Sequence, residues 1–213
     1  MPRARPRASV RAVSASLQLG LFTAGAPSID EAFGGLVRTE LAHGAWYEHQ
    51  PGWVRGADAL YEQLRDALTW QRERRVMYDR EVDTPRLLAG YPRGGPRHPL
   101  LERMRELLGA RYGDAFVRVT AAWYRDGSDS VALHGDTTAR DMVSSTMATV
   151  SLGAPRRFLL KPTEGGASRA LELGRGDLLV MGGTIQRTWR HGIPKVASAG
   201  PRIAVMFRPS WGD

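Results

Sequence analysis

From Phe116 onward, apolar and polar residues alternate in short segments that are separated by turns containing glycine or proline. A period of two is typical of β-strands, because successive side chains of a strand point to opposite faces of the sheet. Many short strands at regular spacing predict a sandwich or a barrel. The segments with this pattern cover residues 116–124, 131–136, 146–152, 157–161, 169–173, 178–181, 188–191 and 202–207, and Gly182-Gly183 is expected to break the sixth. Two earlier segments, 36–40 and 46–49, are also predicted as strands.

Two stretches ahead of the strand-rich part have apolar residues at helical spacing. The first covers residues 59–70, and Asp58 is expected to cap its start. The second covers 99–108; Pro99 suits a first helical position, and Gly109 is expected to end the helix. Both can cover one outer sheet face. We therefore predict an α+β, mainly β fold: a double-stranded β-helix, or jelly roll, with two helices packed on one sheet.

A chain of 213 residues is long enough for a core of its own, and we expect one domain over residues 31–213. Residues 1–30 contain four arginines, several serines and two early prolines, and no acid precedes Asp30. This composition predicts a flexible basic tail. No apolar run is long enough to span a bilayer. We expect a cytoplasmic monomer with no membrane association.

The formal charge is +8, and a basic protein of this size favours a polyanionic partner. The alternative is a composition bias, because only two of the 30 basic residues are lysines. The chain contains no cysteine, which excludes disulfides, iron–sulfur clusters, thiolate zinc sites and cysteine nucleophiles. A protein-bound metal would therefore need histidine and carboxylate ligands.

The segment 72–97 lies between the two predicted helices and is rich in arginine, glycine and proline. Its arginines, Arg86 among them, surround Tyr78 and Tyr91. Basic residues interleaved with aromatic ones suit a surface that holds backbone phosphates and stacks a base. The alternative is a solvated loop with two half-buried tyrosines.

His134 and Asp136 are two residues apart, so on a strand both side chains lie on the same face. Two histidines and one carboxylate form a facial set of ligands for iron(II), which leaves the opposite positions open. His191, in a later strand-like segment, is the natural third ligand. A lone His-x-Asp pattern is usually a surface pair, and the residues that follow it in the sequence favour the metal hypothesis.

Residues 202–208 contain the last predicted strand and the arginine that follows it. By the period of two, Ile203 shares one face with other apolar residues, whereas Arg202 and Arg208 share the other face with Met206. If that second face lines the interior of a jelly roll, its arginines need anionic partners. A dicarboxylate co-substrate supplies such partners, because the guanidinium fork matches carboxylate geometry. The alternative is a solvent-facing strand.

Taken in order, these motifs resemble those of the AlkB family of alkylation-repair dioxygenases. The resemblance runs from about Trp70 to the C-terminus. It is carried by Tyr124-Arg125-Asp126-Gly127, Leu133-His134-Gly135-Asp136, Val150-Ser151-Leu152-Gly153, Gly176-Asp177-Leu178-Leu179-Val180-Met181, His191-Gly192 and the final Arg202 to Arg208.

The resemblance implies oxidative removal of alkyl groups from base nitrogens, with iron(II), 2-oxoglutarate and O2. It implies that the iron-centred catalytic ligands are His134, Asp136 and His191, and that 2-oxoglutarate binds Tyr124, Arg202 and Arg208. It also makes residues 72–97 a nucleotide-recognition lid. The substrate residues that we assign on this basis are Tyr78, Arg86 and Thr138.

The chain departs from the family pattern at Ala122 and Ala204, where asparagine is usual, and at Met206, where threonine is usual. Thr138 stands where the family often has an acid that recognises the damaged base. The expected partner is alkylated DNA, including single-stranded DNA, with RNA as a further candidate. The alternatives are the same chemistry on RNA or on a protein side chain, and an inactive jelly-roll binding module.

Overall fold

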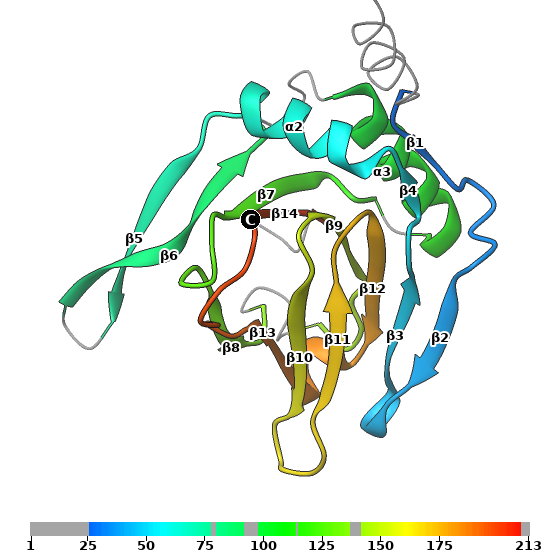
Figure 1. Cartoon of the computed structure of the whole chain (residues 1–213). Coiled ribbons are helices and arrows are strands. Elements are labelled where there is room, and N and C mark those ends of the chain that lie inside the picture. Colours follow the sequence, from blue (N-terminus) through cyan, green and yellow to red (C-terminus); the bar gives the residue numbers. More distant parts are fainter. Residues whose placement is uncertain (1–25, 78–79, 92–97, 114, 137–141, 210–213) are drawn as a thin grey trace, which may run out of the picture.

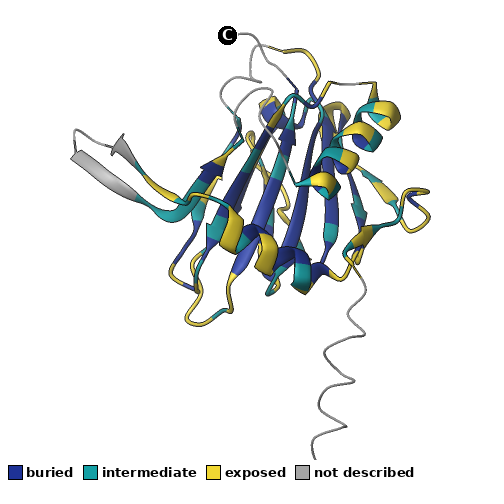
Figure 2. Ribbon diagram, turned by 90° about the horizontal axis from the view of Figure 1, so that it is seen from above, coloured by how far each residue is buried: buried dark blue, intermediate teal, exposed yellow. Residues whose placement is uncertain are grey.

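The computed structural model describes residues 26–77, 80–91, 98–113, 115–136 and 142–209. These residues form three layers: two helices, a large sheet, and a small sheet on the side of the large sheet opposite the helices (Figure 1). In the view of Figure 2 the helices lie across the face of the large sheet. Within the described residues, no helix is long and apolar enough to cross a membrane.

The large sheet has eight antiparallel strands in the order β2-β3-β12-β9-β14-β7-β6-β5. In chain order they are β2 (Val37–Glu40), β3 (Ala45–Gln50), β5 (Gln71–Met77), β6 (Arg80–Gly90), β7 (Arg118–Tyr124), β9 (Met147–Gly153), β12 (Asp177–Gly183) and β14 (Arg202–Arg208). Strands far apart in the sequence alternate across its centre. That crossing of connections is the topology of a jelly roll.

The small sheet has four antiparallel strands in the order β11-β10-β13-β8. They are β8 (Val131–His134), β10 (Arg156–Pro162), β11 (Arg169–Leu173) and β13 (Trp189–Ile193). Two short strands, β1 (Ser28–Ile29) and β4 (Val54–Arg55), pair separately, and η1 (Ala42–Gly44) and α4 (Ile185–Thr188) are single turns. The predicted fold class is confirmed, and every strand expected from the alternation is present.

Strand β14 shows how the period of two divides the interior into two cores. Ile203, Val205 and Phe207 are fully buried in the core between the large sheet and the helices. Ala204 faces the opposite way and is buried in the core between the two sheets. Arg202 is fully buried and lies on that same inner face, since it is two residues from Ala204. The predicted inward arginine face is therefore confirmed at Arg202.

The first helix, α2 (Ala57–Ala67), starts and ends earlier than expected, and Asp58 is not its cap. The N-cap is Gly56, which has φ +65° and makes no side-chain cap. Asp58 lies in the first turn instead, where a carboxylate still interacts favourably with the helix dipole. The helix begins early because Ala57 packs into the core.

The second helix, α3 (Pro99–Tyr112), continues past Gly109 for another turn. Its end is at Gly113, which has φ +72° and donates its N–H to the carbonyl of Gly109. The extra turn places Tyr112 against Trp46, with ring centroids 6.2 Å apart. Packing therefore outweighs the preference of glycine for a helix end at position 109.

The Gly182-Gly183 pair does not break β12, which continues through both residues. A Cβ atom at Gly182 would lie 2.0 Å from Cζ2 of Trp46 on the neighbouring strand β3. Glycine here allows the indole ring to lie directly on the strand. The prediction of a break was wrong because glycine was needed for packing and not for a turn.

The segment expected to be a lid contains two strands. β5 and β6 pair as a hairpin that extends the large sheet beyond β7 and projects from the body of the fold (Figures 1 and 2). Residues 78–79 and 92–97 lie outside the described residues. The alternative of a solvated loop is therefore wrong for residues 72–77 and 80–90, whereas Tyr91, which follows β6, is half-buried as that alternative expected.

Candidate metal and co-substrate site

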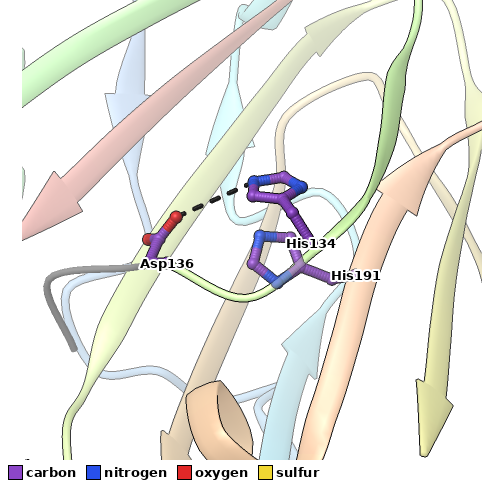
Figure 3. Close-up of side chains that lie close together, drawn as sticks. All are labelled: His134, Asp136 and His191. Atoms are coloured by element: carbon purple, nitrogen blue, oxygen red, sulfur yellow. Dashed lines mark ion pairs between the residues drawn. The ribbon is translucent and has the colours of Figure 1, made fainter. Parts of the chain in front are cut away.

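His134, Asp136 and His191 come together on the small sheet. His134 ends β8 and is the register partner of His191 on the adjacent strand β13, and Asp136 follows two residues after His134. One ligand atom from each of the three residues can be chosen so that all lie within 4.8 Å of one another. Figure 3 shows the three side chains converging on a common space. The spacing fits a single metal ion.

A backbone hydrogen bond fixes the orientation of the His134 ring. Its Nδ1 lies 2.8 Å from the carbonyl oxygen of Ala132, and since a carbonyl can only accept, Nδ1 carries the hydrogen. The other ring nitrogen, Nε2, lies 3.8 Å from Oδ1 of Asp136, and in the neutral ring it carries the lone pair. A backbone carbonyl that orients the second nitrogen is a common feature of metal-binding histidines.

His191 lies deeper than His134. Burial lowers the pKa of His191 to about 3, and the neighbouring His134 acts in the same direction, so its imidazole is neutral. A neutral imidazole is the form that binds a metal. His191 is 7% exposed as a residue, whereas 37% of the His134 side chain is exposed. The site is therefore accessible from the His134 side.

Asp136 is held at both its carboxylate and its backbone. Burial would raise the pKa of this carboxyl, but the Arg208 guanidinium and nearby histidines outweigh burial, and the pKa is lowered. Nε of Arg208 donates to Oδ2 of Asp136 at 2.9 Å. The Asp136 N–H donates to Oε1 of Gln186, also at 2.9 Å. The arrangement leaves Oδ1 facing Nε2 of His134.

This donor set fits iron(II). Two imidazole nitrogens and one carboxylate oxygen are the facial ligands of non-haem iron oxygenases, with positions left for a co-substrate and oxygen. Within the described residues, no other group of three or more such side chains could hold a metal.

Arg202 is a buried cation with few partners. One guanidinium nitrogen, Nη2, donates to Oγ of Ser151 at 2.5 Å, while Nε and Nη1 have no hydrogen-bond partner among the described residues. Burial lowers the pKa of Arg202 to about 10, against the opposing effect of Tyr124, whose ring centroid lies 5.2 Å from the guanidinium carbon. A buried guanidinium with two unpartnered donor nitrogens fits a carboxylate ligand.

The other predicted co-substrate residues lie in the same interior. Tyr124 is the register partner of Arg202 across β7 and β14, and it is buried. Arg208 lies at the far end of β14, where Nη1 donates to Thr120 at 3.0 Å and Nη2 contacts the Met206 sulfur at 3.4 Å. Met206 therefore contacts Arg208 directly from the position where the family usually has threonine.

Three buried polar residues near the site were not predicted. Ser151 lies within the motif Val150-Ser151-Leu152-Gly153, and the alternation of side chains along β9 could have predicted that its hydroxyl lies on the inner face. Gln186 lies in α4, a single turn with no sequence pattern of its own. Arg156 is 2% exposed and donates to the carbonyl oxygens of Asp126, Asp129 and Pro194, which joins the turn after β7 to the end of β13.

Of the three predicted substrate residues, the structure describes only Arg86. Tyr78 and Thr138 lie outside the described residues. Arg86 is half-buried on β6, and its Nη1 donates to the carbonyl oxygen of Ser130 at 3.3 Å, just ahead of β8. Its side chain thus connects the hairpin to the strand that carries His134.

Comparisons with known proteins agree with this geometry. Residues 96–208 match the sequence model of the 2OG-Fe(II) oxygenase superfamily. The chain is 30% identical over 187 residues to the alpha-ketoglutarate-dependent dioxygenase alkB homolog 3 of Homo sapiens, which covers 76% of this chain and 65% of that protein. It is 32% identical over 122 residues to the DNA oxidative demethylase ALKBH2 of Bos taurus, covering 53% of this chain and 44% of that protein.

Among solved structures, OsALKBH1 superposes with a TM-score of 0.57 at 13% identity, over 81% of this chain and 100% of that chain. At 13% identity this likeness shows that the two chains share a fold and nothing about function. The match to alkB homolog 3 extends over 65% of that relative's length.

Proposed function

Because this chain belongs to the 2OG-Fe(II) oxygenase superfamily, whose metal and co-substrate are iron(II) and 2-oxoglutarate, we propose that it uses O2 to remove N-alkyl groups from nucleic-acid bases, with alkylated DNA as the substrate. The observation that carries the chemistry is the pairing of two features in one interior. These are the His134, Asp136 and His191 triad and the buried, incompletely bonded Arg202.

In this proposal the triad holds iron(II). Bound there together with 2-oxoglutarate and O2, iron(II) would supply the oxidising chemistry that places one oxygen atom of O2 in a C–H bond of the alkyl group, with succinate and carbon dioxide as co-products. The hydroxylated carbon would then leave the base as an aldehyde: its C–N bond breaks, the bonding electrons return to the nitrogen, and the hydroxyl proton passes to the base or to solvent. The chain must keep His134 and His191 neutral and Asp136 ionised, and the pKa shifts of His191 and Asp136 favour those forms.

Arg202 holds one carboxylate of 2-oxoglutarate through its Nε and Nη1 donors. Tyr124 lies beside it and Ser151 fixes the third nitrogen, so the guanidinium is oriented before the ligand arrives. Preorganised donors in a water-poor interior bind an anion more strongly than the same donors in water. Arg208 lies at the metal end of the same strand face, where it holds Asp136 and can meet the second carboxylate.

The substrate approaches over His134, the more exposed ligand. We assign residues 72–97 as a nucleotide-recognition lid, with Tyr78, Arg86 and Thr138 as substrate residues. The support is that the hairpin of β5 and β6 adjoins β7, and that Arg86 reaches the residue before β8. A base must leave its stack to reach a metal set between two sheets, and single-stranded DNA requires the least energy for this.

The test is formaldehyde release from N-methylated oligonucleotides by the purified chain with iron(II), 2-oxoglutarate and ascorbate. Matched single-stranded DNA, double-stranded DNA and RNA oligomers separate the substrate classes. We expect the highest turnover on single-stranded DNA. Absence of turnover on every methylated nucleic acid, with iron and 2-oxoglutarate demonstrably bound, would contradict the dealkylation proposal. Turnover on RNA alone would replace DNA as the substrate.

A further inference from the structure

Gln186 contacts the backbone of the metal-ligand segment, whereas Arg208 contacts the Asp136 carboxylate. Gln186 lies on α4, the single turn between β12 and β13, and is 3% exposed. Its Oε1 accepts the backbone N–H of Asp136 at 2.9 Å. No titratable group is involved, so this hydrogen bond persists wherever the fold is stable.

The amide of Gln186 is fixed at both ends. Its Nε2 donates to the sulfur of Met147, which is itself buried on β9 of the large sheet. A sulfur acceptor on one side and an N–H donor on the other permit only one orientation of the amide. The side chain therefore connects the large sheet to the end of β8.

The backbone of Gln186 also limits where the ligand segment can lie. A Cβ atom at Gly135 would be 2.6 Å from the Gln186 carbonyl oxygen. The chain between His134 and Asp136 thus passes directly against α4. A single residue contacts this segment through both its backbone and its side chain.

The turn that carries Gln186 is anchored independently of the metal site. Oγ1 of Thr184 donates to the carbonyl oxygen of His43 at 2.7 Å, and Oγ1 of Thr163 donates to the carbonyl oxygen of Thr188 at 2.5 Å. The turn continues directly into β13, which carries His191. A fixed α4 therefore sets the position of Asp136 relative to His191.

We propose that Gln186 is a positioning residue for the metal ligand Asp136, an inference that rests on the metal site of the proposed function. The other side chain that holds Asp136 is Arg208, which we also assign to 2-oxoglutarate. If binding of the co-substrate draws Arg208 away, the hydrogen bond that Gln186 accepts from the Asp136 N–H still holds Asp136 in place. Residues that orient metal ligands commonly contribute 10- to 100-fold to metal affinity.

The test compares Gln186→Met with Thr184→Val in the full chain. Gln186→Met preserves the volume of the side chain and removes the acceptor of the Asp136 N–H. Thr184→Val removes a hydrogen bond of the same turn that does not involve Asp136. Mn(II) affinity by calorimetry, the visible spectrum of bound Co(II) and thermal unfolding of the metal-free proteins are measured for each, and for the wild type.

We expect Gln186→Met to weaken Mn(II) binding about tenfold and to change the Co(II) spectrum, while Thr184→Val leaves both unchanged. Adding 2-oxoglutarate should widen the difference between Gln186→Met and wild type. Equal Mn(II) affinity in Gln186→Met and wild type would overturn the inference. So would equal losses in both variants, because the effect would then be the stability of α4. A wild-type chain that binds no metal would instead contradict the proposed function.

Discussion

Nε of Arg208 donates a 2.9 Å hydrogen bond to Oδ2 of Asp136, so the guanidinium of the last inner-face arginine is bonded to a candidate metal ligand. The two residues are 72 apart in the sequence. The bond assigns the two carboxylate oxygens different roles, because Oδ2 accepts from Arg208 and Oδ1 faces His134. Oδ1 is therefore the oxygen that would be available to a metal.

Arg208→Met should make metal binding more sensitive to acid. Burial raises the pKa of Asp136 and Arg208 opposes it, so removing the guanidinium raises that pKa. The carboxylate would then protonate at a higher pH, and a protonated carboxyl does not bind the metal. Mn(II) affinity measured at falling pH should decline earlier in Arg208→Met than in wild type. Coinciding pH profiles would show that Arg208 does not control the ionisation of Asp136.

Arg202→Met should abolish the response to 2-oxoglutarate without weakening the metal-free fold. The guanidinium is fully buried and has two unpartnered donors, and replacing a buried charge by an apolar side chain of similar length is often neutral or stabilising. Losing one partner of a buried charge pair costs roughly 2–5 kcal/mol of binding free energy. In thermal unfolding with Mn(II), 2-oxoglutarate should raise the Tm of wild type only. A large loss of stability in the variant without ligand would instead assign Arg202 a structural role.

The start of α3 should weaken in acid through His98. Its Nδ1 accepts the N–H of Leu100, and burial lowers the pKa of His98 below its ordinary value of 6.5. A lowered folded pKa means that the folded state binds fewer protons. The contribution to stability is therefore present above about pH 6.5 and is lost as the pH falls below it.

His98→Asn preserves an N-cap acceptor and removes the proton-binding group. The difference in free energy of unfolding between wild type and His98→Asn should therefore change across this pH range, with wild type losing more stability on acidification. Parallel pH profiles of the two proteins would exclude His98 as the source.

Gly135→Ala should disturb the metal site through α4. The new Cβ would lie 2.6 Å from the Gln186 carbonyl oxygen, so the backbone must move, at a cost of about 1–3 kcal/mol. Gly90→Ala is the matched control, because a Cβ there meets nothing within 4 Å and its φ is not positive. Mn(II) affinity should fall for Gly135→Ala and stay at the wild-type value for Gly90→Ala. Unchanged affinity in both would mean that β8 can shift without moving Asp136.

Local sequence patterns were sufficient for those parts of the site that depend on strand geometry. The period of two places Arg202 on the inner face of β14. The two-residue spacing keeps Asp136 close to His134, although β8 ends at His134 and Asp136 lies just beyond the strand. The pairing of His134 with His191 follows from the register of β8 and β13, which the resemblance anticipated and no local pattern specifies.

The residues that the sequence did not predict are those whose role depends on packing. Gln186 acquires its contacts only when α4 meets β8, and a four-residue turn has no periodicity to reveal it. Glycine at positions 182 and 109 predicted the end of a strand and of a helix. In the structure β12 continues because Gly182 lies against Trp46, and α3 continues to Tyr112.

The most direct test of the central claim is mass spectrometry of a single-stranded DNA oligomer with one N-methylated base, incubated with iron(II), 2-oxoglutarate and O2. Wild type should yield the unmodified oligomer, with one formaldehyde and one succinate for each methyl group lost. Asp136→Ala, tested in parallel, should yield neither. Consumption of 2-oxoglutarate by wild type with the methyl group still on the base, or full repair by Asp136→Ala, would contradict the account.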